Sequence, residues 1–370
     1  MVAAASVVVM TGAAAGTMAA LDDGRGPDRA RPDVTRSTVL QRQTVVPSAP
    51  PGTPSAAPSP ARTSSAPSRS AATPSRKPRS ASPPALLYRH SESQVLDWLA
   101  AHPGDPRRAV IASRIADRPA AVWFADFSPS TITARVRAVT SAAAAQGRVP
   151  VLVPYTIPNR DCGGASRGGA PDLSAYDAWI DGFAAGLGSG EVIVVLEPDS
   201  VAQSDCLTEG RQADRFASLA RAGRVLKAAD PKARVYYDGG HSGWNAAAEQ
   251  ASLLDRAGAA APEGSDGIFT NVSNFQRTGD EIAYAREVLA RLGGSARLGA
   301  VIDTSRNGNG APADGAWCDP AGRRIGQAPT LRTGEAGIDA YLWVKLPGES
   351  DGCKGTPGSF SPEYAYQLAR

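Results

Sequence analysis

The chain has 370 residues, of which 42% are hydrophobic and 20% are charged, and its formal net charge is +3. The positive charge lies near the N-terminus: residues 22–84 contain ten Arg or Lys against four Asp, so the rest of the chain is net negative. A nucleic-acid partner is therefore a poor interpretation, because the large C-terminal part lacks a basic balance.

Residues 1–21 contain no charged side chain and end in small residues. This pattern predicts an export signal peptide or a membrane anchor. A positive charge usually precedes the apolar run of a signal peptide, and no Lys or Arg does so here. From the apolar segment we expect an extracellular protein, secreted or tethered to the outer face of the membrane through residues 1–21. The missing positive charge leaves cleavage undecided.

Residues 22–84 have thirteen prolines, no aromatic residue and long Ser, Thr and Ala tracts. Such a composition cannot bury enough apolar surface to offset the entropy of ordering the chain. The segment is predicted to be a disordered linker, with a reach on the order of 190 Å at about 3.1 Å per residue. A spacer at the cell surface or cell wall fits this composition.

Residues 85–370 are long enough for one large α/β domain, and all four cysteines lie in them. An even number of cysteines in an exported chain favours disulfides, for which three connectivities exist. No C-x-x-C spacing occurs and the chain has only three His, so no metal site is expected. Nothing in the sequence indicates a cofactor or oligomerisation, so a monomer is expected.

Strand and helix patterns alternate from residue 120 onward. Seven short apolar or β-branched runs predict strands at residues 120–125, 149–155, 191–197, 233–238, 267–272, 297–303 and 340–345. Helical spacing separates most of them, at residues 131–145, 174–187, 211–229, 244–257 and 279–292. Alternation with continuous apolar strands predicts a parallel sheet covered by helices.

Two architectures fit this alternation: an α/β barrel of seven or eight strands, and an open doubly wound sheet. Polar clusters follow nearly every strand, which favours the barrel, because an open sheet concentrates its site at one switch point. No G-x-G-x-x-G opens a helix after a strand, so dinucleotide binding lacks support. No G-x-S-x-G is present either, which argues against a serine hydrolase.

Four carboxylates follow predicted strands: Asp161 in YTIPNRDCGG, Asp199 in VIVVLEPDS, Asp238 in VYYDGGHSGW and Asp351 in LWVKLPGESDG. Hydrolysis of a glycosidic bond needs one protonated carboxyl group as acid and a second carboxylate that acts on water or as nucleophile. Asp199 is the best acid candidate, because its apolar run would raise its pKa. Asp161 is a neighbour whose charge would keep that proton on, and Asp351 is the candidate base.

Sugar rings present apolar faces and a fringe of hydroxyl groups, so a sugar site needs flat aromatic side chains and polar partners. Trp123, Trp244 and Trp317 each lie at a predicted strand end or in a glycine-rich loop. Polar candidates lie beside them, with His241 near Trp244 and Asn271 after a strand. We interpret His241 as a ligand of sugar hydroxyl groups.

From about residue 120 to the C-terminus the chain resembles glycoside hydrolase family 6, the inverting cellulases that cut β-1,4-glucan, and especially its actinobacterial endoglucanases. Seven motifs carry the resemblance in order: YTIPNRDCGG, WIDGFAAGLGSGEVIVVLEPDS, YYDGGHSGW, TNVSNF, VIDTSRNGNG, WCDP and LWVKLPGESDGC. The resemblance implies a distorted, partly open α/β barrel. It also implies two disulfides, Cys162 with Cys206 and Cys318 with Cys353.

The resemblance further assigns roles to residues. Asp199 would be the general acid, Asp161 the residue that raises its pKa, and Tyr155 a neighbour of the distorted sugar. Asp351 stands at the position proposed as base, where water is reached through a chain of solvent. The positions that match sugar-binding residues are Trp123, Asp238, His241, Trp244, Asn271, Trp317, Lys345 and Glu349.

The expected activity is inverting, endo-acting hydrolysis of β-1,4-glucosidic bonds in cellulose or soluble β-glucan. Short stretches between the motifs predict an open groove and internal cutting. Three alternatives stay open: an exo-acting cellobiohydrolase, cleavage of mixed-linkage glucan or xylan, and a non-catalytic glucan-binding protein of the cell surface. The three intact carboxylates speak against the last of these.

Overall fold

The structure is a computed structural model, and it describes residues 86–293 and 297–370. The segments predicted to be a signal or anchor (1–21) and a linker (22–84) lie outside the described residues. In the part of the chain that the structure describes, no helix has the length and apolar character needed to cross a membrane.

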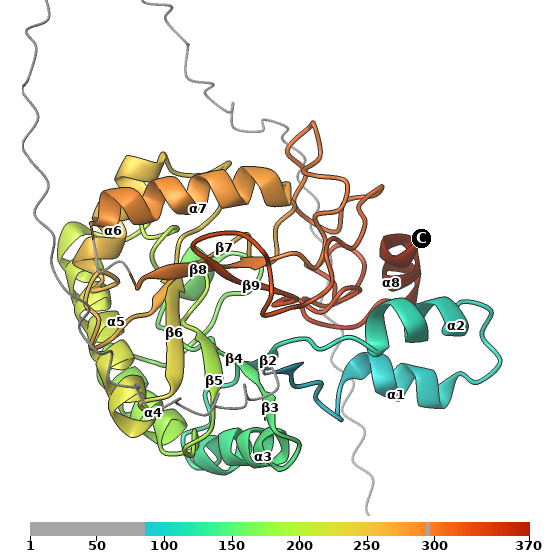
Figure 1. Cartoon of the computed structure of the whole chain (residues 1–370), viewed down its shortest axis with the longest axis horizontal. Coiled ribbons are helices and arrows are strands. Elements are labelled where there is room, and N and C mark those ends of the chain that lie inside the picture. The colour runs from blue at the N-terminus through green and yellow to red at the C-terminus, as the bar shows by residue number, and fades with distance from the viewer. Residues whose placement is uncertain (1–85, 294–296) are drawn as a thin grey trace, which may run out of the picture. The chain divides into compact units, whose positions relative to one another are not determined.

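Seven parallel strands form one curled sheet (Figure 1). Their order is β2-β4-β5-β6-β7-β8-β9, which follows the chain except that β3 lies in another sheet. The strands are β2 (Val122–Phe124), β4 (Val151–Pro154), β5 (Val192–Val195), β6 (Ala233–Asp238), β7 (Gly267–Thr270), β8 (Gly299–Asp303) and β9 (Ile338–Leu342). A short pair, β1 (Leu86–Leu87) with β3 (Arg148–Val149), forms a second small sheet. All seven predicted strands are confirmed.

Helices cover the outer face of the curled sheet (Figure 1). They are α3 (Ile132–Ala145), α4 (Leu173–Ala184), α5 (Glu209–Ala229), α6 (Ala247–Arg256) and α7 (Thr278–Leu292). The five predicted helices are therefore confirmed. Between β8 and β9 the chain runs through residues 304–337, where the structure describes no helix.

The two faces of the strands pack into two different cores. On β5, Ile193 and Val195 lie in the cluster inside the curl, whereas Val192 and Val194 lie in the cluster between sheet and helices. Successive side chains of a strand point to opposite faces, so a strand buried on both sides reads as one apolar run. Each fully buried aliphatic side chain contributes about 1.5–3 kcal/mol.

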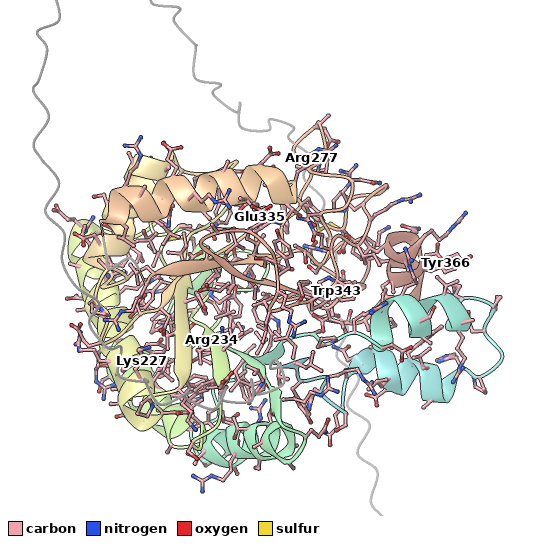
Figure 2. The ribbon with its side chains drawn as sticks, viewed as in Figure 1. Lys227, Arg234, Arg277, Glu335, Trp343 and Tyr366 are labelled. Carbon is pink, nitrogen blue, oxygen red and sulfur yellow. A yellow bond between two sulfur atoms is a disulfide. The ribbon has the colours of Figure 1, made fainter. Side chains whose placement is uncertain are left out.

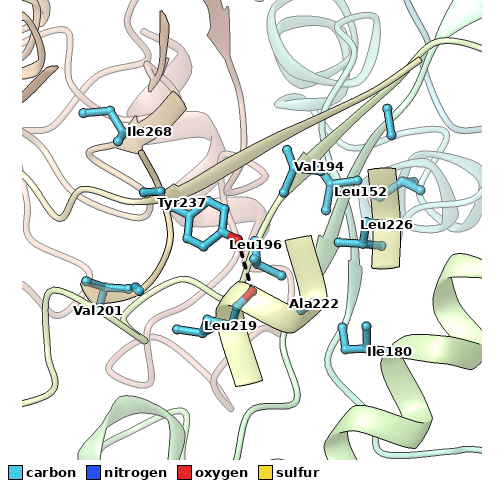
Figure 3. Close-up of a cluster of buried hydrophobic side chains, with 14 of the residues drawn as sticks. Leu152, Ile180, Val194, Leu196, Val201, Leu219, Ala222, Leu226, Tyr237 and Ile268 are labelled. Atoms are coloured by element: carbon cyan, nitrogen blue, oxygen red, sulfur yellow. Dashed lines mark hydrogen bonds between the residues drawn. The ribbon is translucent and has the colours of Figure 1, made fainter. Parts of the chain in front are cut away.

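The hydroxyl group of Tyr237, in the outer core, has a hydrogen-bond partner. Figure 3 shows Tyr237 among Leu152, Val194 and Leu226, with its hydroxyl group donating to the Leu219 carbonyl oxygen at 3.1 Å. A Cβ atom at Gly223 would lie 2.1 Å from this hydroxyl group. Only glycine at that position lets α5 approach the sheet this closely.

Among residues 86–293 and 297–370, no strand ladder closes the barrel. β2 pairs only with β4 and β9 only with β8, while the Ala121 amide donates to the Trp343 carbonyl oxygen at 2.9 Å. Trp123 adds a bond from its indole Nε1 to the Val344 carbonyl oxygen, at 2.7 Å. The prediction of a partly open barrel is thus confirmed, and the sequential strand order excludes the doubly wound alternative.

A cluster of helices lies beside the gap between β2 and β9 (Figure 1). It comprises α1 (Gln94–Ala101), α2 (Arg108–Ile111), a π-helical turn (Ala112–Ala116) and α8 (Pro362–Ala369). Its apolar core contains Trp343, which follows β9, and α8 also carries Tyr366 (Figure 2). These helices were not predicted from the sequence.

Candidate active site

Asp199 lies in the loop that follows β5, at the carboxyl ends of the strands. Its backbone adopts a left-handed conformation, with φ of 69°. Burial raises the pKa of this carboxyl group to about 7, and the negative charges of Asp238 and Asp161 act in the same direction. The hydrogen bond from Tyr155 and the charge of Lys345 oppose the rise. Asp199 is therefore a carboxyl group that keeps its proton up to neutral pH.

A chain of hydrogen bonds connects Asp199 to Asp161. The Tyr155 hydroxyl oxygen lies 3.1 Å from Asp199 Oδ2 and 2.8 Å from Ser166 Oγ. Ser166 Oγ lies 2.9 Å from Asp161 Oδ2, which also accepts the Ser166 amide at 2.8 Å. The two carboxyl groups are thus joined through two hydroxyl groups.

The protonation of Asp199 sets the direction of this chain. Burial raises the pKa of Tyr155 far above its ordinary value, so the phenol keeps its proton. With Asp199 protonated, Asp199 donates to Tyr155, Tyr155 to Ser166, and Ser166 to Asp161. With Asp199 ionised, the Tyr155 hydroxyl group is free to turn and donate to Asp199, because a hydroxyl group has one proton and two acceptor positions.

The loop that carries Asp161 has an unusual backbone. Asn159, Asp161 and Cys162 all have positive φ, at 54°, 52° and 45°. Arg160 holds the loop by donating to the carbonyl oxygens of Ser166 and Ala125, both at 2.7 Å, and its guanidinium group lies over the Tyr155 ring.

A disulfide between Cys162 and Cys206 ties the Asp161 loop to the segment after Asp199. It spans 44 residues, so it stabilises the fold by on the order of 4 kcal/mol through the entropy of the unfolded chain. A second disulfide joins Cys318 to Cys353. These are the two pairs that the family resemblance implies.

Three other carboxylates at strand ends hold backbone instead of facing the site. Glu197 accepts the amides of Thr156 and Ile157, both at 3.0 Å. Asp238 accepts three amides, those of Val201, Ala202 and Gly240, at 2.8–3.0 Å. Asp303 also accepts three, those of Ser273, Ser305 and Lys345. Each carboxylate thereby connects the loop after a neighbouring strand to the loop after its own strand.

Asp351, the predicted base, lies in a buried ionic cluster. Its Oδ2 accepts the Arg306 guanidinium group at 2.7 Å and the Asp319 amide at 3.1 Å, and its Oδ1 accepts Lys345 Nζ at 3.1 Å. Arg306 is fully buried. Asp351 is therefore a carboxylate whose two oxygens already have cationic partners, and no contact in the described residues joins it to Asp199.

Asp319 fixes the loop that carries Asp351. Its carboxylate accepts the amides of Asp351, Cys353 and Lys354 at 2.7–3.0 Å, and the Ser350 hydroxyl group at 2.5 Å. The Cys318–Cys353 disulfide reinforces the same connection. The segment around Trp317 is thereby held to the Asp351 loop.

The predicted aromatic residues differ in exposure. Trp244 and Trp317 are 43% and 57% exposed, the only exposed tryptophans of the described residues. Trp123 is half-buried and packs edge-on against Tyr155, with ring centroids 5.2 Å apart. Trp244 and Trp317 therefore have faces open to a ligand. Trp123 instead donates its indole hydrogen bond to Val344 across the gap between β2 and β9.

His241 is buried against Trp244, with ring centroids 4.5 Å apart. Burial lowers its pKa to about 4, so the ring is neutral at neutral pH. Its Nδ1 accepts the Gly243 amide at 3.1 Å, which assigns the ring proton to Nε2. His241 thus presents a neutral donor.

Two predicted sugar-binding residues have their polar atoms engaged by the protein. Asp238 is buried under three amides, as described above, and Asn271 is fully buried. Asn271 donates to the carbonyl oxygens of Gln276 and Asp303 and accepts the Gln276 amide. Both residues shape the loops of the site from beneath.

Lys345 and Glu349 lie near Asp351. Lys345 Nζ donates to the Ser350 carbonyl oxygen as well as to Asp351. Burial raises the pKa of Glu349 to about 7, against the opposing charges of Lys345 and Arg306. Both side chains are half-buried, so each keeps some access to solvent.

Sequence reasoning missed Ser166 and the structural roles of Glu197 and Asp319. A charged residue inside the apolar run VIVVLEP was a signal for Glu197. Ser166 stands in GGASRGG, which reads only as a flexible glycine-rich loop. Its place between Tyr155 and Asp161 follows from loop geometry that local sequence does not encode.

The chain matches known proteins over most of the described domain. The model of the family described as glycosyl hydrolases family 6 matches residues 85–367. Endoglucanase 1 of Streptomyces sp. (strain KSM-9) is 55% identical over 291 residues, which cover 78% of this chain and 79% of that protein. Endoglucanase A of Thermobispora bispora is 50% identical over 76% of this chain, which spans only 61% of that protein.

A solved structure agrees with these relatives. The endoglucanase Cel6 of Mycobacterium tuberculosis, in complex with methyl-cellobiosyl-4-deoxy-4-thio-β-D-cellobioside, superimposes with a TM-score of 0.71 at 38% sequence identity. The match covers 77% of this chain and 96% of that one.

The raised pKa of Asp199 predicts a stability effect. Below an ordinary aspartate pKa of 3.8 both folded and unfolded states hold this proton, so the group has no effect on unfolding. As the pH rises toward 7 the unfolded state releases the proton first, so Asp199 increasingly destabilises the fold. We expect Asp199→Asn to raise the unfolding temperature, and to raise it more at pH 8 than at pH 4.

Differential scanning calorimetry of the full chain measures this effect. Asp214→Asn, at an exposed position on α5, makes the same change of charge and should shift the unfolding temperature little at either pH. An Asp199→Asn variant that is no more stable than the wild type at pH 8 would contradict the assignment.

Proposed function

The chain belongs to glycoside hydrolase family 6, and from that premise we propose that it hydrolyses internal β-1,4-glucosidic bonds of cellulose or soluble β-glucan with inversion. The observation that carries this proposal is Asp199, a carboxyl group whose pKa of about 7 suits an acid at neutral pH. Glycoside hydrolysis requires such an acid beside the leaving oxygen.

Asp199 acts as the general acid that protonates the leaving oxygen. When its proton leaves, the Tyr155 hydroxyl group turns to donate to the new carboxylate at 3.1 Å. Ser166 can then donate to Tyr155, so both hydrogen bonds point toward the new negative charge on Asp199. Asp161 contributes the negative charge that holds the proton on Asp199 before the reaction.

Water attacks the anomeric carbon from the opposite side, because inverting enzymes use no covalent intermediate. Asp351 assists this attack at the position proposed as base in the family. Its oxygens accept Arg306, Lys345 and the Asp319 amide, which favours contact with the attacking water through solvent over direct contact. Asp161 helps to organise the same water.

Substrate binding falls to the aromatic and polar residues of the rim. Trp244 and Trp317 offer exposed faces to glucose rings, and Trp123 lies against Tyr155 near the acid. His241, Lys345 and Glu349 would bind hydroxyl groups, whereas Asp238 and Asn271 would act by holding the loops. No metal or cofactor takes part in this mechanism.

We favour endo action over exo action, because the short connections between motifs predict an open groove. The names of the relatives that are 50% and 55% identical also describe endoglucanases. A non-catalytic glucan-binding protein is disfavoured, because Asp161, Asp199 and Asp351 are all present and Asp199 has the raised pKa of an acid.

Two disulfides favour an extracellular location, since such bonds persist in oxidising compartments. In this proposal residues 1–21 direct export or tether the chain, residues 22–84 act as a spacer, and residues 85–370 form a monomeric catalytic domain. A tethered domain would then reach glucan at a distance from the cell surface.

Asp199→Asn tests the acid assignment. On carboxymethylcellulose we expect the full-length wild type to lower viscosity quickly for each reducing end released, as internal cutting does. We expect the variant to lose at least about a thousandfold in kcat, because removing the acid removes its share of transition-state stabilisation. Binding of cello-oligosaccharides should persist in the variant.

The control is Asp214→Asn, which should keep wild-type activity. Near-normal turnover by Asp199→Asn on an unactivated glucan would overturn the acid assignment. No cleavage of carboxymethylcellulose, barley glucan or cello-oligosaccharides by the wild type would favour the glucan-binding alternative. Slow viscosity loss with rapid release of reducing ends would indicate exo action.

The stereochemistry of the product tests the mechanism separately. Inversion converts a β-glucosidic bond into an α-anomeric product. Proton NMR in the first minutes of cello-oligosaccharide hydrolysis, before the anomers equilibrate, should therefore show the α-anomer in excess. An initial excess of the β-anomer would mean retention and refute the proposed mechanism.

A further inference from the structure

A short segment, residues 156–159, connects the two residues that act on the acid. It begins directly after Tyr155, at the end of β4, and leads into the Asp161 loop. Two charged side chains hold its backbone from beneath, Glu197 from the end of β5 and Arg215 from α5. Glu197 is fully buried and Arg215 is 2% exposed.

Glu197 holds the first half of the segment. Its Oε1 accepts the Thr156 amide and its Oε2 accepts the Ile157 amide, both at 3.0 Å. Its own amide donates to the Pro154 carbonyl oxygen at 3.1 Å. Glu197 thus contacts the chain on both sides of Tyr155, while Asp199 stands two residues further along its own loop.

Arg215 holds the second half through carbonyl groups. Its Nη2 donates to the carbonyl oxygens of Pro158 at 2.8 Å and Asn159 at 3.1 Å. Its Nη1 reaches the Ser200 carbonyl oxygen at 3.5 Å, next to Asp199. The Glu197 carboxylate therefore accepts hydrogen bonds from the amides of the segment, and the Arg215 guanidinium group donates to its carbonyl oxygens.

The two side chains complement each other in charge as well as in hydrogen bonding. Burial raises the pKa of Glu197 to about 7, and its two amide hydrogen bonds and the positive charge of Arg215 oppose the rise; burial lowers the pKa of Arg215, and the negative charge of Glu197 opposes that fall. Two charged groups buried this fully are costly unless they are paired and hydrogen-bonded. Their bonds lie on the loops of β4 and β5, which carry Tyr155 and Asp199.

We propose that Glu197 and Arg215 are positioning residues that hold the Tyr155 hydroxyl group against Asp199. Neither residue touches the substrate in this account. Both act through the backbone of residues 156–159, which sets where Tyr155 stands relative to the acid. The inference rests on the proposed function, because it concerns the proton affinity and the turnover of Asp199.

Glu197→Gln in the full chain is the test variant. A carboxamide keeps the size of the side chain but offers one acceptor, so its amide nitrogen faces one of the two backbone amides. We expect kcat on a cello-oligosaccharide to fall about 10- to 100-fold, as misplacement by about 1 Å does, with KM changed less than about twofold. The basic limb of the kcat–pH profile of Glu197→Gln should shift in the same direction as that of Tyr155→Phe.

A double-mutant cycle separates positioning from general damage. If Glu197 acts through Tyr155, the double variant Glu197→Gln with Tyr155→Phe should be no more than about twofold slower than the slower single variant. Asp339→Asn is the matched control. This half-buried carboxylate accepts the Tyr236 hydroxyl group near the start of β9, and its substitution should leave kcat and the pH profile unchanged.

Arg215→Lys decides the question if Glu197→Gln does not fold, since it keeps the charge but loses the double contact with Pro158 and Asn159. A folded variant at either position with wild-type kcat and pH profile would overturn the inference. So would a double variant with Tyr155→Phe in which the two losses of kcat multiply. A wild type whose activity does not depend on Asp199 would instead overturn the proposed function.

Discussion

The site depends on buried carboxylates that accept backbone amides at the carboxyl ends of the strands. Glu197, Asp238 and Asp303 each accept two amides from loops of neighbouring strands, and Asp238 and Asp303 each accept a third from their own loop. The hydrogen bonds between strands end where the strands diverge. These carboxylate–amide contacts join the loops beyond that point. The loops that carry the reactive groups are thereby fixed to each other as well as to their own strands.

Asp199 stands apart from this set. Within the described residues its carboxyl group has one hydrogen-bond partner, the Tyr155 hydroxyl group. Two or three amides would stabilise an ionised carboxylate, whereas burial beside Asp238 and Asp161 without them favours the proton. Burial also raises the pKa of Glu197 to about 7 and raises the pKa of Asp238 and Asp303, so what sets Asp199 apart is that its carboxyl group faces a hydroxyl group instead of backbone amides.

Much of the fold followed from the sequence, because strands buried on both faces read as unbroken apolar runs such as VIVVLE. The helices beside the gap in the barrel were missed, since their apolar residues pack against Trp343 from a distant part of the chain. Asp199, Asp161 and Asp351 could be named from strand-end position and motif. That Asp238 and Asn271 face backbone, and that Ser166 bridges Tyr155 to Asp161, depends on contacts between loops that local sequence does not encode.

The protonation of Asp199 is the central claim, and infrared difference spectroscopy of wild type against Asp199→Asn tests it most directly. If Asp199 is the acid, the wild type has a protonated carboxyl band that the variant lacks and that disappears as the pH rises through about 7. A band that is already absent at pH 5 would mean that Asp199 is ionised where the proposed acid must hold its proton, and would contradict the account.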